Sequence, residues 1–229
     1  MNRSEINRIM KDAKEFIRSE KFYLPPFAFW SPESWHRRGR EVEEIVENKL
    51  GWDITDFGMG NFQKIGLFLF TIRNGKPENL KTLQGKLYAE KVMIIDVDQV
   101  TPFHFHWKKT EDIINRGGGD LLIQLYNATQ DEQVDKESHV RVATDGVWRS
   151  VAAGGIIRLT PGESITLEPY CYHQFWAEES PVLAGEVSTV NDDEADNRFS
   201  EPVGRFPEIV EDEPPLHLLV TDYPLYYKI

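Results

Sequence analysis

From about residue 62 to residue 190, the chain consists of short runs of β-branched and aromatic residues. Residues typical of turns separate these runs. Such runs are typical of β-strands, and the dipeptides Asn74-Gly75 and Asp145-Gly146 favour the tight turns that join antiparallel strands. No helical periodicity separates the runs, so we predict a mainly β fold, either an antiparallel barrel or a two-sheet jelly roll. The predicted strands cover residues 65–73, 89–97, 101–107, 120–127, 139–143, 147–151, 155–159, 164–168, 172–177 and 182–187.

Helical patterns are confined to the first part of the chain. Apolar residues between Ile6 and Ile17 recur at helical spacing, which predicts an amphipathic helix over residues 4–18. A second helix is predicted over residues 40–50, where Gly51 would end it.

These patterns indicate a single domain with two additions. We expect residues 1–60 to form a helical extension outside the barrel and residues 62–190 to form the barrel core. Residues 191–229 are expected to form a C-terminal loop and tail. The tail from Pro214 to Ile229 is apolar and aromatic, so we expect it to dock on the protein.

The acidic composition limits the partners of the protein. Its net charge of -12 at pH 7 argues against binding to nucleic acid or to an anionic membrane surface. No run of about 20 apolar residues is present, so no membrane-spanning helix is expected. Cys171 is the only cysteine, which excludes a disulfide framework and favours a reducing, cytoplasmic setting. We expect its thiol to be buried and inert.

Three histidines and a glutamate have the spacing of a metal site. His104 and His106 are two residues apart on a predicted strand and therefore point to the same face. Glu111 has the wrong parity for a straight strand, so a turn before it must bring it back. His173 lies on a later strand, behind the turn at Pro161-Gly162. Three imidazoles and one carboxylate suit a divalent transition ion, and on an octahedral ion they leave two positions open.

The alternative is that these are three hydrogen-bonded histidines and a surface glutamate. The ordered conjunction of the motif HxHx4E, a glycine turn at residues 117–119 and a later histidine favours the metal site. His36, His139 and His217 lack such neighbours, and we interpret them as structural or surface residues. Lys108 and Lys109 fall in the predicted turn and are expected to be solvated.

Two charged residues share strand faces with apolar residues. Lys91 alternates with Met93 and Ile95, so its ammonium is expected to point into the barrel. It then either binds a substrate hydroxyl or an oxyanion, or lies at the rim and extends out to water. Glu186 alternates with Ala184 in the same way, and is either a proton carrier or the partner of a buried base such as Lys91.

The segment after the last predicted strand is polar. Asp192 lies in a cluster of Asp, Asn and Arg residues between residues 191 and 198, and Arg205 follows it. Such side chains can both donate to and accept from the hydroxyl groups of a sugar, so we predict that Asp192 and Arg205 contact substrate. The alternative is a solvated acidic loop.

The motif HxHx4E, followed by a Pro-Gly turn and a further histidine, resembles the two motifs of the cupin superfamily. The segments 101–128, 158–179 and 185–199 more specifically resemble the cupin-type D-lyxose isomerases of bacteria. That resemblance implies a cupin jelly-roll barrel with helices outside it, and a manganese-dependent aldose–ketose isomerase, often a homodimer. Its implied substrates are D-lyxose with D-xylulose and, to a lesser extent, D-mannose with D-fructose. The resemblance also implies that the metal ligands are His104, His106, Glu111 and His173.

Other functions remain open at this point. An iron-dependent cupin dioxygenase uses the same ligand set, and the N3O set itself would accept Co, Fe or Zn as well as Mn. A phosphosugar isomerase would need a cationic cluster or exposed backbone N–H groups for the phosphate. A non-catalytic sugar-binding module would not need open metal positions. Transfer of the substrate proton through an enediol and a direct hydride shift are both open.

Overall fold

The computed structural model describes residues 1–193, 195–204 and 208–227. Strands dominate it, and none of the helices in this part of the chain combines the length and apolar composition needed to cross a membrane. The helices are α1 (Arg3–Ser19), η1 (Pro26–Phe29), α2 (Pro32–His36), η2 (Arg40–Val42), α3 (Glu43–Glu47), α4 (Pro77–Thr82) and α5 (Tyr223–Tyr226). The strands are β1 (Gly51–Thr55), β2 (Leu67–Arg73), β3 (Tyr88–Ile95), β4 (His104–Phe105), β5 (Glu111–Ala128), β6 (Val134–Asp135), β7 (Val140–Thr144), β8 (Val147–Val151), β9 (Ile156–Leu159), β10 (Ser164–Leu167), β11 (Cys171–Thr189) and β12 (Arg198–Phe199).

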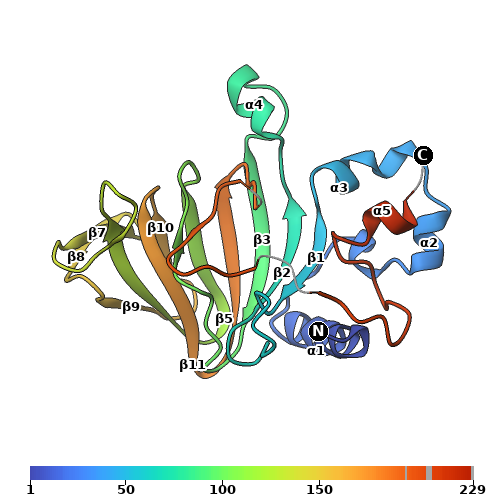
Figure 1. Ribbon diagram of the computed structural model, residues 1–229, viewed down its shortest axis with the longest axis horizontal. Helices are drawn as coiled ribbons and strands as arrows, with labels where there is room; N and C mark the ends of the chain where they lie inside the picture. Colours follow the sequence, from blue (N-terminus) through green and yellow to red (C-terminus); the bar gives the residue numbers. More distant parts are fainter. Residues whose placement is uncertain (194, 205–207, 228–229) are drawn as a thin grey trace.

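The strands form one 12-stranded sheet in the order β1-β2-β3-β11-β5-β10-β7-β8, with the four remaining strands paired off this path. The long strands β5 and β11 lie in the middle and pair antiparallel with each other along most of their length. Figure 1 shows the curved sheet on the left and the helices α1, α2, α3 and α5 gathered beside β1 on the right. The predicted mainly β fold, with N-terminal helices outside the sheet, is confirmed.

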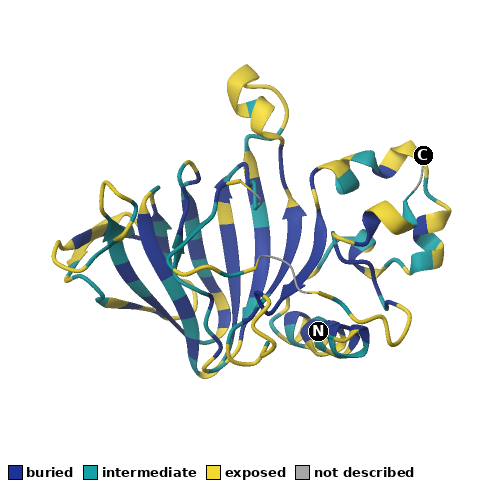
Figure 2. Cartoon of the chain, viewed as in Figure 1, coloured by how far each residue is buried: buried dark blue, intermediate teal, exposed yellow. Residues whose placement is uncertain are grey.

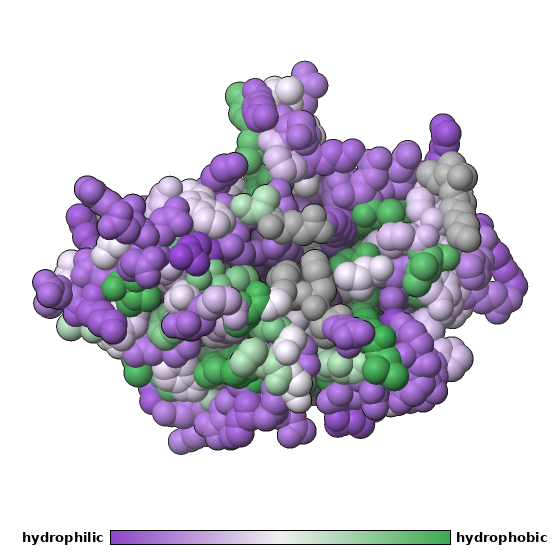
Figure 3. All heavy atoms as spheres, viewed as in Figure 1, coloured by the Kyte–Doolittle hydropathy of each residue, from purple (hydrophilic) through white to green (hydrophobic). Residues whose placement is uncertain are grey.

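Alternation along the strands divides the apolar residues between two cores. Leu69 of β2 packs with Met93 of β3 in one core cluster. Its neighbours Phe68 and Phe70 belong to a second cluster, which includes Ile6 of α1. Buried residues therefore follow the strands through the middle of the molecule, and exposed residues follow the loops and α4 (Figure 2). The face seen in Figure 3 is mostly hydrophilic, with small hydrophobic areas between the polar side chains.

Helix prediction succeeded for α1, whose buried residues Ile6, Met10 and Ala13 keep helical spacing. The helix predicted over residues 40–50 ends earlier, at Glu47. It consists of a 3-10 turn, η2, followed directly by the short helix α3. The strand β1 was missed. Its residues Trp52 to Thr55 do alternate between apolar and polar, but the strand has only five residues and starts at Gly51, the residue expected to end the preceding helix.

The three glycines at residues 117–119 do not form the expected tight turn. They lie inside β5, opposite an irregularity in β11 between Glu178 and Val182. Gly117 and Gly118 have φ values of 156° and 88°, and a Cβ atom on Gly118 would lie 2.1 Å from the carbonyl oxygen of Pro181. The glycines are therefore explained by strand bending and by the close passage of β11. The irregularity does not interrupt β11. The two strands predicted over residues 172–177 and 182–187 are therefore parts of one continuous strand.

The C-terminal segment packs against the N-terminal half of the chain. The backbone N–H of Val220 donates to the carbonyl oxygen of Trp52 at 2.9 Å. The Tyr223 hydroxyl donates to the carbonyl oxygen of Leu50, and its ring centroid lies 4.7 Å from that of Trp35. The tail thus covers the outer edge of β1.

A buried ion pair joins the two ends of the chain. The side chain of Arg3 is 1 % exposed, and its guanidinium donates to the two carboxylate oxygens of Asp222 at 2.8 and 3.0 Å. The guanidinium also donates to both carboxylate oxygens of Glu211.

We expect the substitution Arg3→Leu to lower the free energy of unfolding by about 3 to 5 kcal/mol, because it leaves the buried Asp222 carboxylate without its cation. Urea denaturation measures this loss. Arg8→Leu is the matched control on the same helix, since Arg8 pairs with Asp12 while their side chains are 59 % and 68 % exposed. That pair should contribute about 1 kcal/mol or less, so equal losses in the two variants would contradict this interpretation.

Candidate functional site

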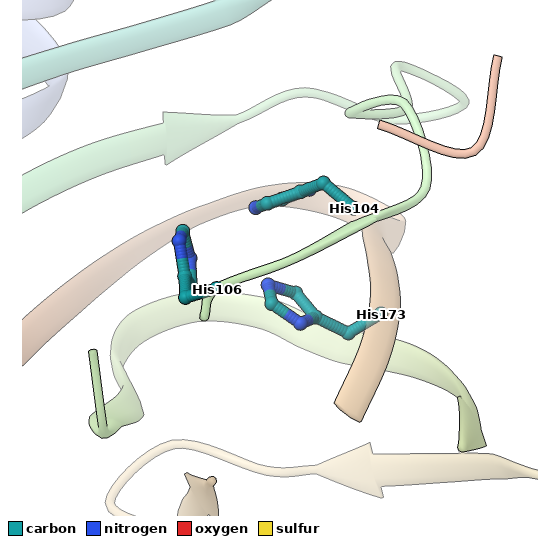
Figure 4. A group of neighbouring side chains, drawn as sticks. All are labelled: His104, His106 and His173. Atoms are coloured by element: carbon teal, nitrogen blue, oxygen red, sulfur yellow. The ribbon is translucent and has the colours of Figure 1, made fainter. Parts of the chain in front are cut away.

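Three histidines converge at the end of the barrel core. Strand pairing places His104 of β4 directly opposite His173 of β11, and His106 follows two residues later. One ring nitrogen from each histidine lies within 4.8 Å of the corresponding atoms of the other two. Figure 4 shows the three rings pointing toward one another from the two segments.

Backbone carbonyl groups fix the tautomers of the three rings. The Nδ1 atoms of His104, His106 and His173 lie 2.9, 2.6 and 3.0 Å from the carbonyl oxygens of Pro102, Asp196 and Cys171. A carbonyl oxygen only accepts, so each Nδ1 carries the proton and each Nε2 presents a lone pair. Burial, followed by the neighbouring imidazoles, lowers the pKa of His104 well below its usual value. This ring is therefore a neutral electron-pair donor.

Glu111, the first residue of β5, completes the group. Its Oε1 atom lies 3.1 Å from Nε2 of His173 and 3.4 Å from Nε2 of His106. Burial alone would raise the pKa of Glu111, but the ammonium of Lys109 and the contacts with His106 and His173 together outweigh burial and hold this pKa well below its usual range. The carboxylate is thus ionised, and the structure brings together all four residues that the sequence motif named.

The donor atoms of this group fit a cation. In the part of the chain that the structure describes, Glu111 Oε1, His106 Nε2 and His173 Nε2 are buried and have no hydrogen-bond partner. All three are acceptors with the tautomers given above, so they repel one another at 3.1 to 3.4 Å unless positive charge lies between them. A divalent ion held by three imidazoles and one carboxylate would satisfy these atoms together.

The turn before Glu111 is held by Asp196. The Asp196 carboxylate accepts hydrogen bonds from the backbone N–H groups of Lys108 and Lys109 at 3.0 and 2.9 Å. Its carbonyl oxygen accepts the Nδ1 proton of His106. One residue of the polar loop therefore orients both a histidine and the segment that returns Glu111 to the site, which is how a second shell supports ligands.

Lys109 is not solvated, contrary to the sequence expectation. Its side chain is 3 % exposed, and its Nζ atom lies 2.6 Å from Oε2 of Glu111 and 2.9 Å from Oε1 of Glu186. Burial would lower the pKa of Lys109, but the carboxylates of Glu111, Glu186 and Asp193 together outweigh burial and raise this pKa. The prediction was wrong because the chain bends after Trp107, so position in the presumed turn did not reveal the direction of the side chain.

Lys91 and Glu186 lie inside the barrel, as their parity suggested. They are opposite each other on β3 and β11, and the Nζ of Lys91 lies 3.4 Å from Oε1 of Glu186. Lys91 also lies 3.5 Å from Oδ1 of Asp193. The chain of contacts therefore runs from Glu111 through Lys109, Glu186 and Lys91 to Asp193.

The three histidines and this chain of charges line one cavity. Its wall also contains Thr101, Asn197 and apolar residues such as Phe57. Asp192 does not line this cavity and borders a neighbouring depression instead. Its side chain accepts a hydrogen bond from the backbone N–H of Ala195. Asp193 takes the position that we expected for Asp192, and Arg205 lies outside the described residues. Cys171 is buried, and burial raises the pKa of its thiol to about 12.

Comparisons with known proteins agree on one type of enzyme. A sequence model of the D-lyxose isomerase family matches residues 1–223. The D-lyxose/D-mannose isomerase of Serratia proteamaculans is 49 % identical over 226 residues, which are 97 % of this chain and 98 % of that protein. A protein of the same description from Escherichia coli O157:H7 is 48 % identical over 97 % of this chain and 98 % of that protein.

A solved structure with a similar fold is that of L-ribose isomerase from Cellulomonas parahominis. It superposes with a TM-score of 0.59 at 16 % identity and covers 92 % of this chain and 98 % of that one. At this identity the likeness concerns the fold, and it agrees with the predicted cupin-type barrel.

Proposed function

Because the chain belongs to the D-lyxose isomerase family, we propose that it interconverts D-lyxose and D-xylulose, and also D-mannose and D-fructose, with the help of a divalent metal ion. The observation that carries this proposal is the convergence on one cavity of Lys91, Lys109 and Glu186 with three electron-pair donors that have no partner among the residues described. An aldose–ketose isomerase needs charge stabilisation at two neighbouring oxygens and a group that moves a proton between two neighbouring carbons.

The metal would be held by His104, His106, Glu111 and His173. When bound, it would supply electrostatic polarisation of the sugar carbonyl and of the neighbouring hydroxyl. We propose manganese as the ion, with Co, Fe or Zn as the alternatives that an N3O donor set also accepts.

Glu186 is the residue that we assign to proton transfer. Both of its lysine contacts are to the same oxygen, Oε1, and we assign the transfer to Oε2. In the aldose-to-ketose direction this carboxylate takes the proton from C2 of the open-chain sugar and returns it to C1 on the same face. The hydroxyl proton on O2 moves to O1, so that an aldehyde at C1 becomes a ketone at C2.

The two lysines hold the reacting groups in place. Lys109 connects Glu111 to Glu186 and so fixes the distance between the metal site and the proton carrier. Lys91 is assigned to a substrate hydroxyl, with Asp193 at its other side. Arg205, predicted from the sequence as a substrate contact, is retained in that role.

The free sugar is favoured over a phosphosugar. A phosphate needs cationic groups that are available to it, but Lys91 and Lys109 are each engaged by two carboxylates. An iron-dependent dioxygenase has no need of a proton carrier placed beside two lysines, and its turnover would consume oxygen. Isomerase activity therefore explains the four ligands together with the residues around them better than dioxygenase activity does.

Metal-stripped protein should produce no ketose from D-lyxose and should recover turnover when Mn is restored. The assay follows D-xylulose formation with Mn, Co, Fe or Zn added separately, beside an oxygen electrode. Full activity of the stripped protein, or oxygen consumption in step with turnover, would contradict the proposal. Mn should restore the highest rate.

Two further properties are proposed with the family assignment. We expect a homodimer in solution, which light scattering at several protein concentrations measures. We also propose a cytoplasmic location, which agrees with a chain whose single thiol, Cys171, is buried and reduced.

A further inference from the structure

Buried polar atoms without a partner gather on the cavity wall. Within residues 1–193, 195–204 and 208–227, six buried side-chain atoms have no hydrogen-bond partner. Three of them, on His106, Glu111 and His173, are donor atoms of the four-residue metal site described above. A fourth, the hydroxyl oxygen Oγ1 of Thr101, belongs to a residue on the wall of the same cavity. The remaining two, on Asn48 and Thr144, belong to residues that do not line this cavity.

A metal ion does not explain the Thr101 hydroxyl. The unpartnered atoms of the histidines and of Glu111 are acceptors, which a cation satisfies directly. A hydroxyl group also carries a proton, and a cation supplies no acceptor for it. The side chain is 4 % exposed, and water in bulk is therefore not its partner. A hydroxyl group of a sugar has the matching capacity.

The backbone around Thr101 is fixed on both sides. On one side, the N–H of Val100 donates to the carbonyl oxygen of Lys64 at 3.0 Å. On the other side, the carbonyl oxygen of Pro102 accepts the Nδ1 proton of His104 at 2.9 Å. Thr101 is therefore held in place before substrate arrives, and little further ordering is needed when it binds.

We propose that the Thr101 hydroxyl binds a non-reacting hydroxyl group of the open-chain sugar and so positions the substrate beside the metal site. This inference rests on the proposed function, since it takes the occupant of the cavity to be a polyol. Thr101 supplies a neutral contact on the wall, in addition to the charged contacts from Lys91 and Asp193. It thereby contributes to recognition of the substrate without taking part in proton transfer.

The test compares Thr101→Val, which keeps the shape and removes the hydroxyl, with Thr101→Ser, which keeps the hydroxyl. Thr101→Val should lower kcat/KM for D-lyxose about 10-fold to 100-fold, mainly through KM, because a buried sugar hydroxyl loses its partner. Thr101→Ser should stay within about threefold of the original protein, since the hydrogen bond is kept. Thr101→Ala provides a second variant without the hydroxyl and should show at least the loss of Thr101→Val.

Thr144→Val is the matched control. Its hydroxyl is also buried and has no partner among the described residues, but Thr144 lies on β7 and does not line the cavity. This variant should leave kcat/KM unchanged. Calorimetric titration of the Mn-loaded proteins with D-arabitol, a polyol that cannot isomerise, provides a binding measurement that is independent of turnover. Thr101→Val should weaken this binding by a factor similar to its effect on KM, with the Mn affinity unchanged.

Unchanged D-arabitol binding and kcat/KM in Thr101→Val would overturn the inference. A loss of Mn affinity in that variant would also overturn it, because Thr101 would then act on the metal site through the loop that holds His104. If the original protein binds D-arabitol but forms no ketose, the proposed function fails while the effect of Thr101→Val on polyol binding still decides the role of Thr101.

Discussion

Replacement of His106 by alanine should remove metal binding and turnover together. A four-ligand metal site is worth about 12 kcal/mol, so one ligand contributes about 3 kcal/mol, or roughly a hundredfold in affinity. The variant also loses the Nδ1 contact with Asp196, the residue that holds the turn before Glu111. We therefore expect metal affinity to fall at least about a hundredfold and activity at submicromolar metal to fall below about 1 %. Metal content after dialysis and ketose formation measure the two effects.

His139→Ala is the control for this prediction. His139 is exposed and precedes β7, far along the chain from the ligands. The control should retain metal and activity in full. A His106→Ala protein that keeps both metal and rate would show that the three histidines do not form the site, even though their ring nitrogens lie within 4.8 Å of one another.

Strand parity explains why much of the site was predictable. His104, Lys91 and Glu186 lie on strands whose neighbouring residues alternate between two faces, and His106 directly follows the short strand β4. Parity alone placed Lys91 and Glu186 inside the barrel, and pairing of β3 with β11 puts them opposite each other. What parity could not supply was the identity of the partners, because that depends on which strands are neighbours in the sheet.

The residues that the sequence misplaced lie where the chain leaves regular structure. Lys109 is part of a bend between β4 and β5, so no periodicity determines its direction. Asp193 rather than Asp192 reaches the cavity for the same reason, since the loop after β11 has no fixed alternation. Gly118 gave a turn signal, but the constraint on it comes from Pro181, which is 63 residues away in the sequence and close only in the folded sheet.

Thr101 and β1 illustrate a second limit. A threonine before a proline has no sequence signature of substrate binding, and what draws attention to Thr101 is its burial without a hydrogen-bond partner in the described part of the chain. β1 is short and buried on both faces, and the burial of its polar residues Asp53 and Thr55 depends on the elements that pack around it. Both features depend on what surrounds the segment, and a single sequence does not contain that information.

The substitution Glu186→Gln should yield a folded, metal-loaded protein whose kcat is about 100-fold to 10,000-fold lower, the range for loss of a general acid–base group. The amide keeps the shape of the side chain. Both lysines that contact Glu186 keep a second carboxylate, because Lys109 also contacts Glu111 and Lys91 also contacts Asp193. Neither ammonium is therefore left buried without a partner, and we expect folding and metal content to be preserved.

Glu178→Gln is the matched control for Glu186→Gln, because it removes an ion-paired carboxylate from the same strand outside the cavity. It should leave kcat unchanged. Turnover of the original protein in deuterated water should place deuterium at C1 of the ketose, since the proton passes through a carboxylate that exchanges with solvent. Ketose free of deuterium would favour a hydride shift, and a normal rate in Glu186→Gln would remove Glu186 from proton transfer. Slow turnover with metal content intact, together with deuterium incorporation by the original protein, would place the proton on Glu186.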